Sequence, residues 1–220
     1  MLKNKILILI IFLFALSMVG YVHAKNQTYP LLGKVIYLDP GHGGADSGAF
    51  YKNVKESDLN LEISHKIMTE LKKDGAVVYL TRYGDYDLSI TGTEKRKRSD
   101  LSRRADIINQ SGCDLYLSIH LNADVDTSWY GAQAYYDKIN SENKFIAEIY
   151  QNQFIKYLGS KRKYKEDSTL YLQRRITKPG ILLELGFLSN PNERELLQDG
   201  KYQEKIAKAV CQGTREYFID

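Results

Sequence analysis

Hydrophobic and polar positions divide the chain into short apolar runs and longer segments with helical periodicity. The apolar runs are bounded by glycine, proline and polar turn residues, which is typical of buried strands. They predict strands near residues 34–39, 76–81, 114–119, 132–137, 169–172 and 180–185.

In the segments between these runs, apolar residues recur every three or four positions. Leu59, Ile63 and Ile67 predict an amphipathic helix over residues 57–73, which ends at Gly75. Further helices are expected from near Asp100, over 142–157 and over 201–218. This alternation predicts an α/β fold: a three-layer single domain whose twisted, mixed, mostly parallel sheet of about six strands is flanked by helices.

The first 24 residues have the layout of a secretory signal peptide. Lys3 and Lys5 precede an apolar run over residues 6–19, and Val22-His23-Ala24 offers small residues at the cleavage positions. The alternative is an uncleaved membrane anchor, although the run is shorter than the about 20 apolar residues of a typical span. We therefore expect a signal or anchor over 1–24, a short tether over 25–32 and one domain over 33–220, which works outside the cytoplasm and contacts the membrane only through its N-terminal segment.

The net charge argues against a nucleic-acid partner. The full chain carries a formal charge of +4, and removal of residues 1–24 takes away Lys3 and Lys5 and no acids, which leaves +2. A nucleic-acid-binding domain normally concentrates basic residues on one face. Cys113 and Cys211 could form a disulfide outside the cytoplasm, but their apolar surroundings favour two separate buried thiols.

Two of the apolar runs end in a histidine. The first enters an Asp39-Pro40-Gly41 turn and then reaches His42, and the second ends at His120. In open α/β sheets, ligands bind at the carboxyl ends of the strands. A single histidine at such a place is usually a hydrogen-bonded loop residue. Only the two histidines together, His42 and His120, indicate a binding site.

Two glutamates complete the candidate chemistry. Glu184 lies within the apolar run from Ile181 to Phe187, where an unpaired carboxylate is costly unless it has a function. Glu56 stands immediately before the helix that opens at Ser57-Asp58; on its own it would be an acid favoured by the helix dipole. Two histidines, one carboxylate and a further glutamate as base match a catalytic Zn²⁺ site, which keeps one position open for water.

Four segments resemble the zinc-dependent N-acetylmuramoyl-L-alanine amidases of bacterial cell walls. They are LDPGHGG around His42, KESDLNLEIS around Glu56, SIHLNAD around His120 and LLELGFLSN around Glu184. The segments occur in order, and the resemblance spans residues 33–218.

The resemblance implies that His42, Glu56 and His120 bind Zn²⁺, and that Glu184 is the catalytic base. Glu62 is the alternative to Glu56 as the carboxylate ligand. Asp39 and Asn122 are expected to support the ligands from behind or to form turns, rather than to act as catalysts. The implied reaction is hydrolysis of the amide between the lactyl group of N-acetylmuramic acid and the L-alanine of the stem peptide in peptidoglycan.

The stretch Gly92 to Arg98 and the segment Lys178-Pro179-Gly180 resemble, more narrowly, the sporulation branch of that family, the CwlD-like amidases of spore-forming bacteria. This branch implies a role in spore-cortex maturation and germination, in which removal of the stem peptide precedes formation of muramic lactam. The alternatives are general vegetative wall turnover, a zinc peptidase acting within the stem peptide, and a peptidoglycan-binding module without activity.

A basic cluster, Lys95 to Arg98 with Arg103 and Arg104, could contact glycan, teichoic acid or a protein partner, although a solvated loop and helix start is the commoner explanation. The segment between His120 and Glu184 has no obvious room for the inserted helix that plugs the zinc site of some division amidases in this family. We therefore expect control through timing of expression or through an activating protein partner. The expected location is the cell wall or the spore envelope.

Overall fold

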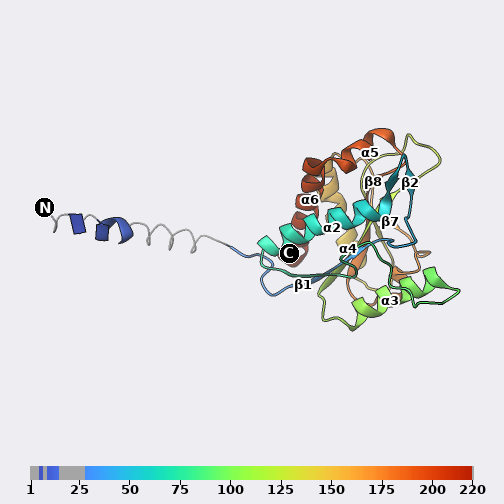
Figure 1. Ribbon diagram of the computed structural model, residues 1–220, viewed down its shortest axis with the longest axis horizontal. Helices are drawn as coiled ribbons and strands as arrows, with labels where there is room; N and C mark the ends of the chain where they lie inside the picture. The colour runs from blue at the N-terminus through green and yellow to red at the C-terminus, as the bar shows by residue number, and fades with distance from the viewer. Residues whose placement is uncertain (1–4, 7–8, 15–27, 220) are drawn as a thin grey trace.

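The computed structural model of the protein describes residues 5–6, 9–14 and 28–219, and its ribbon is shown in Figure 1. The expected signal or anchor over residues 1–24 lies largely outside the described residues, so its cleavage or retention stays a prediction. Within the described ranges, no helix has the length and apolar character needed to cross a membrane.

One mixed sheet forms the centre of the fold, with strand order β4-β1-β5-β8-β6-β7. Its strands are β1 (Val35–Pro40), β4 (Val77–Leu80), β5 (Leu115–Asn122), β6 (Gln133–Tyr136), β7 (Lys165–Glu166) and β8 (Gly180–Phe187). Neighbouring strands are parallel except for the antiparallel pair of β6 and β8. The predicted α/β fold with a mostly parallel sheet of six strands is confirmed.

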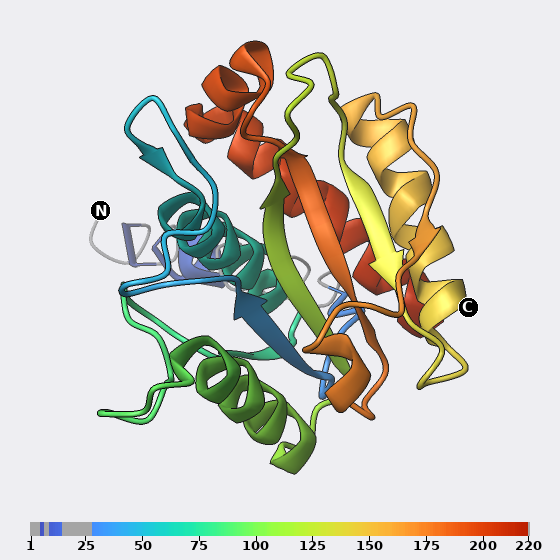
Figure 2. The same cartoon turned by 90° about the vertical axis from the view of Figure 1, so that its right-hand side faces the viewer.

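Helices lie on both faces of the sheet. On one face lie α2 (Glu56–Lys73), α4 (Asn143–Gln153) and α6 (Gly200–Ile219), with α5 (Pro191–Gln198) against α6. On the other face lie α3 (Arg96–Gln110) and the short helix η2 (Gln173–Arg175), and Figure 2 shows α3 in front of the sheet with α2 and α6 behind it. The larger core fills the space between the sheet and α2, α4 and α6, and a smaller cluster lies beneath α3.

The strands divide their side chains between these two faces because successive residues of a strand point in opposite directions. Leu117 and Ile119 of β5 and Leu183 of β8 join the larger core. Ser118 and His120, one position further along β5 in each case, border a cavity on the face that α3 and η2 cover only in part. This face carries the candidate site.

Residues 169–172 do not form the predicted strand. The sixth strand is β7, which pairs with Tyr135 and Tyr136 of β6. The Asp167 carboxylate accepts hydrogen bonds from the backbone N–H of Thr169 at 2.8 Å and from its hydroxyl at 2.6 Å, which turns the chain away from the sheet. Leu170 and Leu172 are apolar because they wall the cavity, not because they join the sheet.

The predicted helices are present, with shifted ends. α3 begins at Arg96 rather than near Asp100. The sequence pattern missed its first turn because these residues are basic and polar and carry no apolar periodicity. α4 ends at Gln153 and continues as the π-helical turn η1 (Phe154–Leu158), which stops at Gly159 with φ 71°.

A short hairpin, β2 (Phe50–Tyr51) and β3 (Val54–Lys55), was not among the predicted elements. Its two-residue turn, Lys52-Asn53, has φ of 50° and 66°, and positive φ at both positions suits the twist of a tight hairpin. The hairpin leads directly into α2, so Glu56 is the first residue of the helix.

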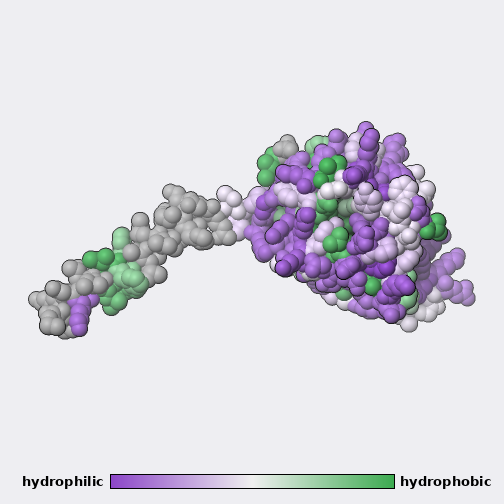
Figure 3. Space-filling view, turned by 90° about the horizontal axis from the view of Figure 1, so that it is seen from above, coloured by the Kyte–Doolittle hydropathy of each residue, from purple (hydrophilic) through white to green (hydrophobic). Residues whose placement is uncertain are grey.

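Over residues 28–219, the face of the molecule in Figure 3 is mainly hydrophilic, and its hydrophobic residues form small, separate spots. Such scattered exposure is normal for the surface of a globular domain.

Candidate metal centre

Three predicted ligands converge from separate elements. His42 lies in the loop after β1, Glu56 begins α2 and His120 lies near the end of β5. One possible ligand atom from each lies within 4.8 Å of the others. The Glu56 carboxylate stands between the two imidazoles, with Oε2 at 3.2 Å from His42 Nε2 and Oε1 at 3.0 Å from His120 Nδ1. The structure therefore brings together the three side chains that the sequence motifs single out.

Glu56 is held as a carboxylate by several donors. Its oxygens accept hydrogen bonds from the backbone N–H of Ala49 (2.9 Å) and Leu121 (3.2 Å) and from the Asn60 amide (3.2 Å). Burial acts to raise the pKa of Glu56, but the two histidines outweigh it and the pKa lies far below its ordinary value. Glu62, the alternative ligand, is exposed in a groove between α2 and α6.

His42 is oriented by a residue that sequence reasoning missed. Its Nδ1 lies 3.0 Å from Asp46 Oδ2, so an Nδ1–H donates to this carboxylate and leaves Nε2 directed toward Glu56. Burial acts to lower the pKa of His42, but Glu56 and Asp46 raise it above the ordinary value. The four-residue spacing of histidine and aspartate in the glycine-rich loop was the available signal.

The loop that carries His42 has an unusual backbone. His42 itself has φ 62°, which L-residues other than glycine rarely adopt. A Cβ on Gly48 would lie 2.5 Å from Glu56 Oε2 and 2.7 Å from His42 Cδ2, and one on Gly41 would lie 2.2 Å from the His120 ring. The two glycines are therefore needed because the backbone passes directly against the ligands.

Two buried arginines bind the carbonyl groups of this loop. Arg82 donates to the carbonyls of Pro40 and Gly41, both at 2.9 Å, and Arg104 donates to those of Pro40 at 2.8 Å and His42 at 2.6 Å. These contacts satisfy backbone acceptors where β1 ends and the loop begins, and so they stabilise the conformation of the loop.

The interpretation of Arg104 as part of an exposed basic cluster is wrong. Its side chain is 1% exposed and forms ion pairs with Asp39 and Asp100, both at 2.9 Å. The i, i+4 spacing of Asp100 and Arg104 was a signal for this pairing. Lys97, by contrast, is exposed and lines the cavity.

Asp39 and Asn122 make no hydrogen bond to a histidine in the described part of the chain. Asp39 binds Arg104 and accepts hydrogen bonds from Thr81 (2.6 Å) and Ser118 (3.0 Å). Burial acts to raise its pKa, but Arg104 and Thr81 outweigh it and the pKa is lowered. Asn122 accepts from the backbone N–H of Ala123 at 2.8 Å, which is a local turn contact. Asp39 thus lines the cavity and binds Arg104 and Ser118, but it makes no hydrogen bond to a candidate ligand among the described residues.

Glu184 lies opposite His120 in the register of β8 and β5. Its Oε2 atom is buried and has no hydrogen-bond partner among the described residues. Burial, and then the negative charge of Glu56, raise the pKa of Glu184 to about 8. A carboxylate oxygen without a hydrogen-bond partner among the described residues, one strand away from His120, is available for proton transfer.

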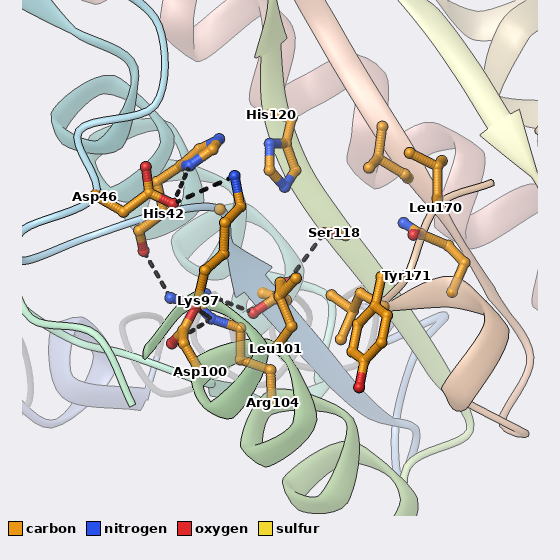
Figure 4. Close-up of a pocket in the computed structure, with 15 residues that line it drawn as sticks. His42, Asp46, Lys97, Asp100, Leu101, Arg104, Ser118, His120, Leu170 and Tyr171 are labelled. Atoms are coloured by element: carbon orange, nitrogen blue, oxygen red, sulfur yellow. Dashed lines mark hydrogen bonds and ion pairs between the residues drawn. The ribbon is translucent and has the colours of Figure 1, made fainter. Parts of the chain in front are cut away.

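A cavity of about 200 Å³ adjoins the two histidines. Lys97 and Leu101 of α3 contribute to its wall, and Leu170 and Tyr171 lie across from the imidazoles, as Figure 4 shows. α4, which follows His120 along the chain, packs in the core on the opposite face of the sheet and does not cover this cavity.

The donor set fits a divalent metal ion. Two imidazole nitrogens and one carboxylate oxygen form one of the ligand sets found at catalytic zinc sites, which leave a further position for water or substrate. Because His42 and His120 both line the cavity, a metal held between them would be reachable by substrate.

The two cysteines are free, and both are buried. Cys113 belongs to the cluster beneath α3, whereas Cys211 belongs to the larger core on the other side of the sheet. The preference for separate thiols is confirmed.

Comparison with known proteins gives consistent results. The profile of the N-acetylmuramoyl-L-alanine amidase family matches residues 36–216. A germination-specific N-acetylmuramoyl-L-alanine amidase from Bacillus subtilis (strain 168) is 42% identical over 217 residues, which are 97% of this chain and 92% of the relative.

Two solved structures show the same fold. The CwlD amidase from Clostridioides difficile, solved in complex with the GerS lipoprotein, matches with a TM-score of 0.80 and 36% identity over 84% of this chain and 98% of that chain. An N-acetylmuramoyl-L-alanine amidase from Clostridium difficile 630 matches with a TM-score of 0.75 and 31% identity over 84% of this chain and 96% of that one.

Proposed function

From the premise that the chain belongs to the N-acetylmuramoyl-L-alanine amidase family, we propose that it is a zinc enzyme of spore-cortex maturation. The resemblance to this family and to its CwlD-like branch is confirmed, and the chain is an amidase acting on peptidoglycan. The zinc, the roles of individual residues, the cortex and the partner are the proposed parts.

The observation that carries the zinc proposal is the meeting of His42, Glu56 and His120 within 4.8 Å. The carboxylate brings one negative charge, so a bound Zn²⁺ keeps a net positive charge. When bound there, zinc supplies Lewis-acid polarisation of the substrate carbonyl and lowers the pKa of water toward about 7.

Glu184 supplies the proton transfer in this proposal. Its free Oε2 accepts a proton from the attacking water and delivers it to the amine nitrogen of L-alanine as the amide bond breaks. Burial of Glu184 supports both steps, because it acts to raise the pKa of the carboxyl group and so helps it hold the proton between acceptance and release. Asp46 keeps Nε2 of His42 free of a proton, and Arg104 holds the loop on which His42 lies.

The cortex role is supported by the 42% identity to a germination-specific amidase of nearly the same length. We further propose an activating lipoprotein partner, because the similar CwlD amidase was solved in complex with the GerS lipoprotein. The proposed location is the cell wall or spore envelope, reached by means of residues 1–24, with the catalytic domain over 33–220.

Mass spectrometry of peptidoglycan digests tests the bond and the metal together. Purified protein incubated with peptidoglycan and zinc should release stem peptides that begin with a free L-alanine amine, and treatment with a chelator should abolish this release. Cleavage elsewhere in the stem would identify a zinc peptidase instead, and release that persists without metal would contradict the zinc proposal.

The muropeptides of spores test the physiological role. A strain that lacks the gene should make cortex without muramic lactam, whereas its vegetative wall should be unchanged. Normal cortex combined with altered vegetative wall would favour general turnover. If activity in solution needs a second protein, the partner proposal gains support; full activity of the chain alone removes it.

A further inference from the structure

Beyond the ligands, the open face of the sheet carries a continuous row of polar side chains. His120 of β5 is in register with Glu184 of β8, and Glu184 is in register with Gln133 of β6. Neighbouring strands lie about 4.8 Å apart, so the row leads about 10 Å from His120 to Gln133. The proposed base stands in its middle.

The Gln133 amide holds an arginine at the far end of this row. Its Oε1 accepts hydrogen bonds from Arg162 Nε at 2.7 Å and from the Tyr135 hydroxyl at 2.9 Å, and its Nε2 donates to the carbonyl of Lys163 at 2.8 Å. Because the amide is fixed on both sides, the Arg162 guanidinium has a defined position.

Aromatic rings and a glycine turn also position Arg162. The guanidinium lies over the ring of Trp129, 5.2 Å from its centroid, and over that of Phe187 at 4.8 Å. A Cβ on Gly131, which has φ 96°, would lie 3.5 Å from Arg162 Cγ, so the arginine stem passes directly against this backbone. Trp129 is 49% exposed, so the guanidinium lies under an accessible ring.

Arg162 has no ion-pair partner among the residues that the structure describes, although it is only partly exposed. The nearby acid, Glu193, uses its oxygens to accept from the backbone N–H of Gly131 at 3.0 Å and of Phe187 at 2.7 Å. Apart from the bond from Nε, the guanidinium makes one further hydrogen bond within the described part of the chain, a long one of 3.4 Å to the carbonyl of Tyr130. N–H donors therefore remain for an external acceptor.

We propose that Arg162 is a subsite for a carboxylate of the stem peptide, borne by the residue that follows the L-alanine. This proposal rests on the amidase activity and on Glu184 as the group that protonates the L-alanine nitrogen. From that nitrogen, the α-carboxyl of the next residue lies about 7 Å away, since one extended residue spans about 3.5 Å. The distance from Glu184 to Arg162 is similar, because Gln133 is one strand spacing of about 4.8 Å from Glu184 and one hydrogen bond from Arg162.

The chemistry of the two groups is complementary. A guanidinium binds a carboxylate through two parallel charge-assisted hydrogen bonds, which a neutral amide cannot reproduce. The subsite would thus select substrates whose second stem residue is D-glutamate with a free α-carboxylate over those in which it is amidated to D-isoglutamine.

Trp129 offers a direct measurement of binding, because it is the only tryptophan in the chain. The zinc-loaded protein is titrated with N-acetylmuramoyl-L-alanyl-D-glutamate and with its D-isoglutamine counterpart while tryptophan fluorescence is followed. We expect the acid to bind at least about tenfold more tightly than the amide. Equal responses, including no response to either compound, would overturn the proposal.

Two variants that each remove one positive charge distinguish a direct contact between Arg162 and the carboxylate from a general effect of net charge on binding. Arg162→Gln should remove the preference for the acid, whereas Lys161→Gln should keep it, because Lys161 is an exposed neighbour that makes no hydrogen bond to Gln133 in the described structure. Arg162→Lys keeps the charge without the planar pair of donors and should retain only part of the preference. Zinc content and Tm of each variant show that it is folded, and the acid–amide comparison in the unaltered protein does not depend on any variant.

Turnover of the same two compounds distinguishes this proposal from the function on which it rests. A lower KM for the acid at similar kcat is the expected result. Cleavage of both compounds with equal kcat/KM would leave the amidase function intact and overturn the Arg162 subsite. Preferential binding of the acid without cleavage of either would support the subsite and contradict the proposed catalytic roles.

Discussion

His120 and Glu184 stand directly opposite each other on the parallel strands β5 and β8. Side chains at such positions share one face of the sheet about 4.8 Å apart, which places the proposed base one strand away from a proposed ligand. Glu184 is not among the side chains that meet around the candidate metal position, and its Oε2 has no partner in the described chain. The register of β5 and β8 therefore places the proposed base, Glu184, apart from Glu56, the carboxylate proposed to bind metal.

Replacing Glu184 by glutamine should remove turnover and preserve zinc. Glutamine keeps the shape of the side chain but cannot accept and release a proton, so we expect kcat to fall about 100- to 10,000-fold. Zinc content, measured by atomic absorption, should stay near one per chain. His120→Ala is the matched comparison and should lose zinc as well as activity. A Glu184→Gln enzyme with near-normal kcat would show that another group is the base.

Glu184 should also make the metal-free protein less stable as the pH rises. Burial and the charge of Glu56 raise the pKa of Glu184 from 4.5 to about 8 in the folded state. The folded protein therefore binds more protons than the unfolded chain between these values, and stability that is present below the lower value is lost as the pH rises through the upper one.

Thermal unfolding checks this pH dependence. Between about pH 5 and about pH 9, the Tm of chelator-treated protein should fall by several degrees relative to that of chelator-treated Glu184→Gln. The other titrating groups are common to both proteins and cancel in the difference. A Tm difference that does not change with pH would mean that Glu184 is ionised throughout.

Arg104→Met should weaken both the fold and zinc binding. The substitution leaves the buried Asp39 carboxylate without its guanidinium and frees the carbonyl of His42. Loss of one partner of a buried ion pair typically costs about 3–5 kcal/mol. Loss of support behind a ligand typically lowers metal affinity about 10- to 100-fold.

Arg103→Met is the control for this change, since Arg103 is the exposed neighbour on the same helix. Chemical denaturation and competition with a zinc-binding dye measure the two effects. If Arg104→Met bound zinc as tightly as the unaltered protein, the loop carbonyls would not need the arginine to keep His42 in place.

Gly41→Ala should displace His120 and abolish zinc binding. The added methyl group would lie within 2.2–2.6 Å of three atoms of the imidazole, closer than van der Waals contact permits. Gly112→Ala is the control, because a Cβ there meets no atom within 4 Å. Zinc content measured on both variants tests this expectation. Equal zinc content would show that the loop can move away from the His120 ring.

The candidate site could be predicted from the sequence only where a residue has a local signature. His42 and His120 end apolar runs, and Glu184 interrupts one, so each is conspicuous in the sequence. Asp46 and Arg104 have only a weak signature, a four-residue spacing from His42 and from Asp100, because an aspartate in a glycine-rich loop and an arginine in a basic helix are usually surface residues. Arg104 acts through its burial behind the His42 loop, which depends on how α3 packs on the sheet, whereas Asp46 is partly exposed and acts through the conformation of the loop that it shares with His42.

Pattern alone also misassigned residues 169–172, where apolar side chains of a loop wall a cavity and, at Leu172, join the smaller core cluster without forming a strand. Hydrophobicity reports that a side chain avoids water, but it does not report whether a strand or a folded-back loop shields it.

By itself, the sequence determined the α/β fold class, the main strands and helices, and the family, because hydrophobic periodicity and short motifs are properties of contiguous residues. Only the tertiary structure decided that Glu56 rather than Glu62 meets the histidines, that Glu184 faces His120, and that Arg104 is buried behind the loop. These relationships join residues far apart in the chain, and they are set by strand register and by the packing of α2 and α3 on opposite faces of one sheet.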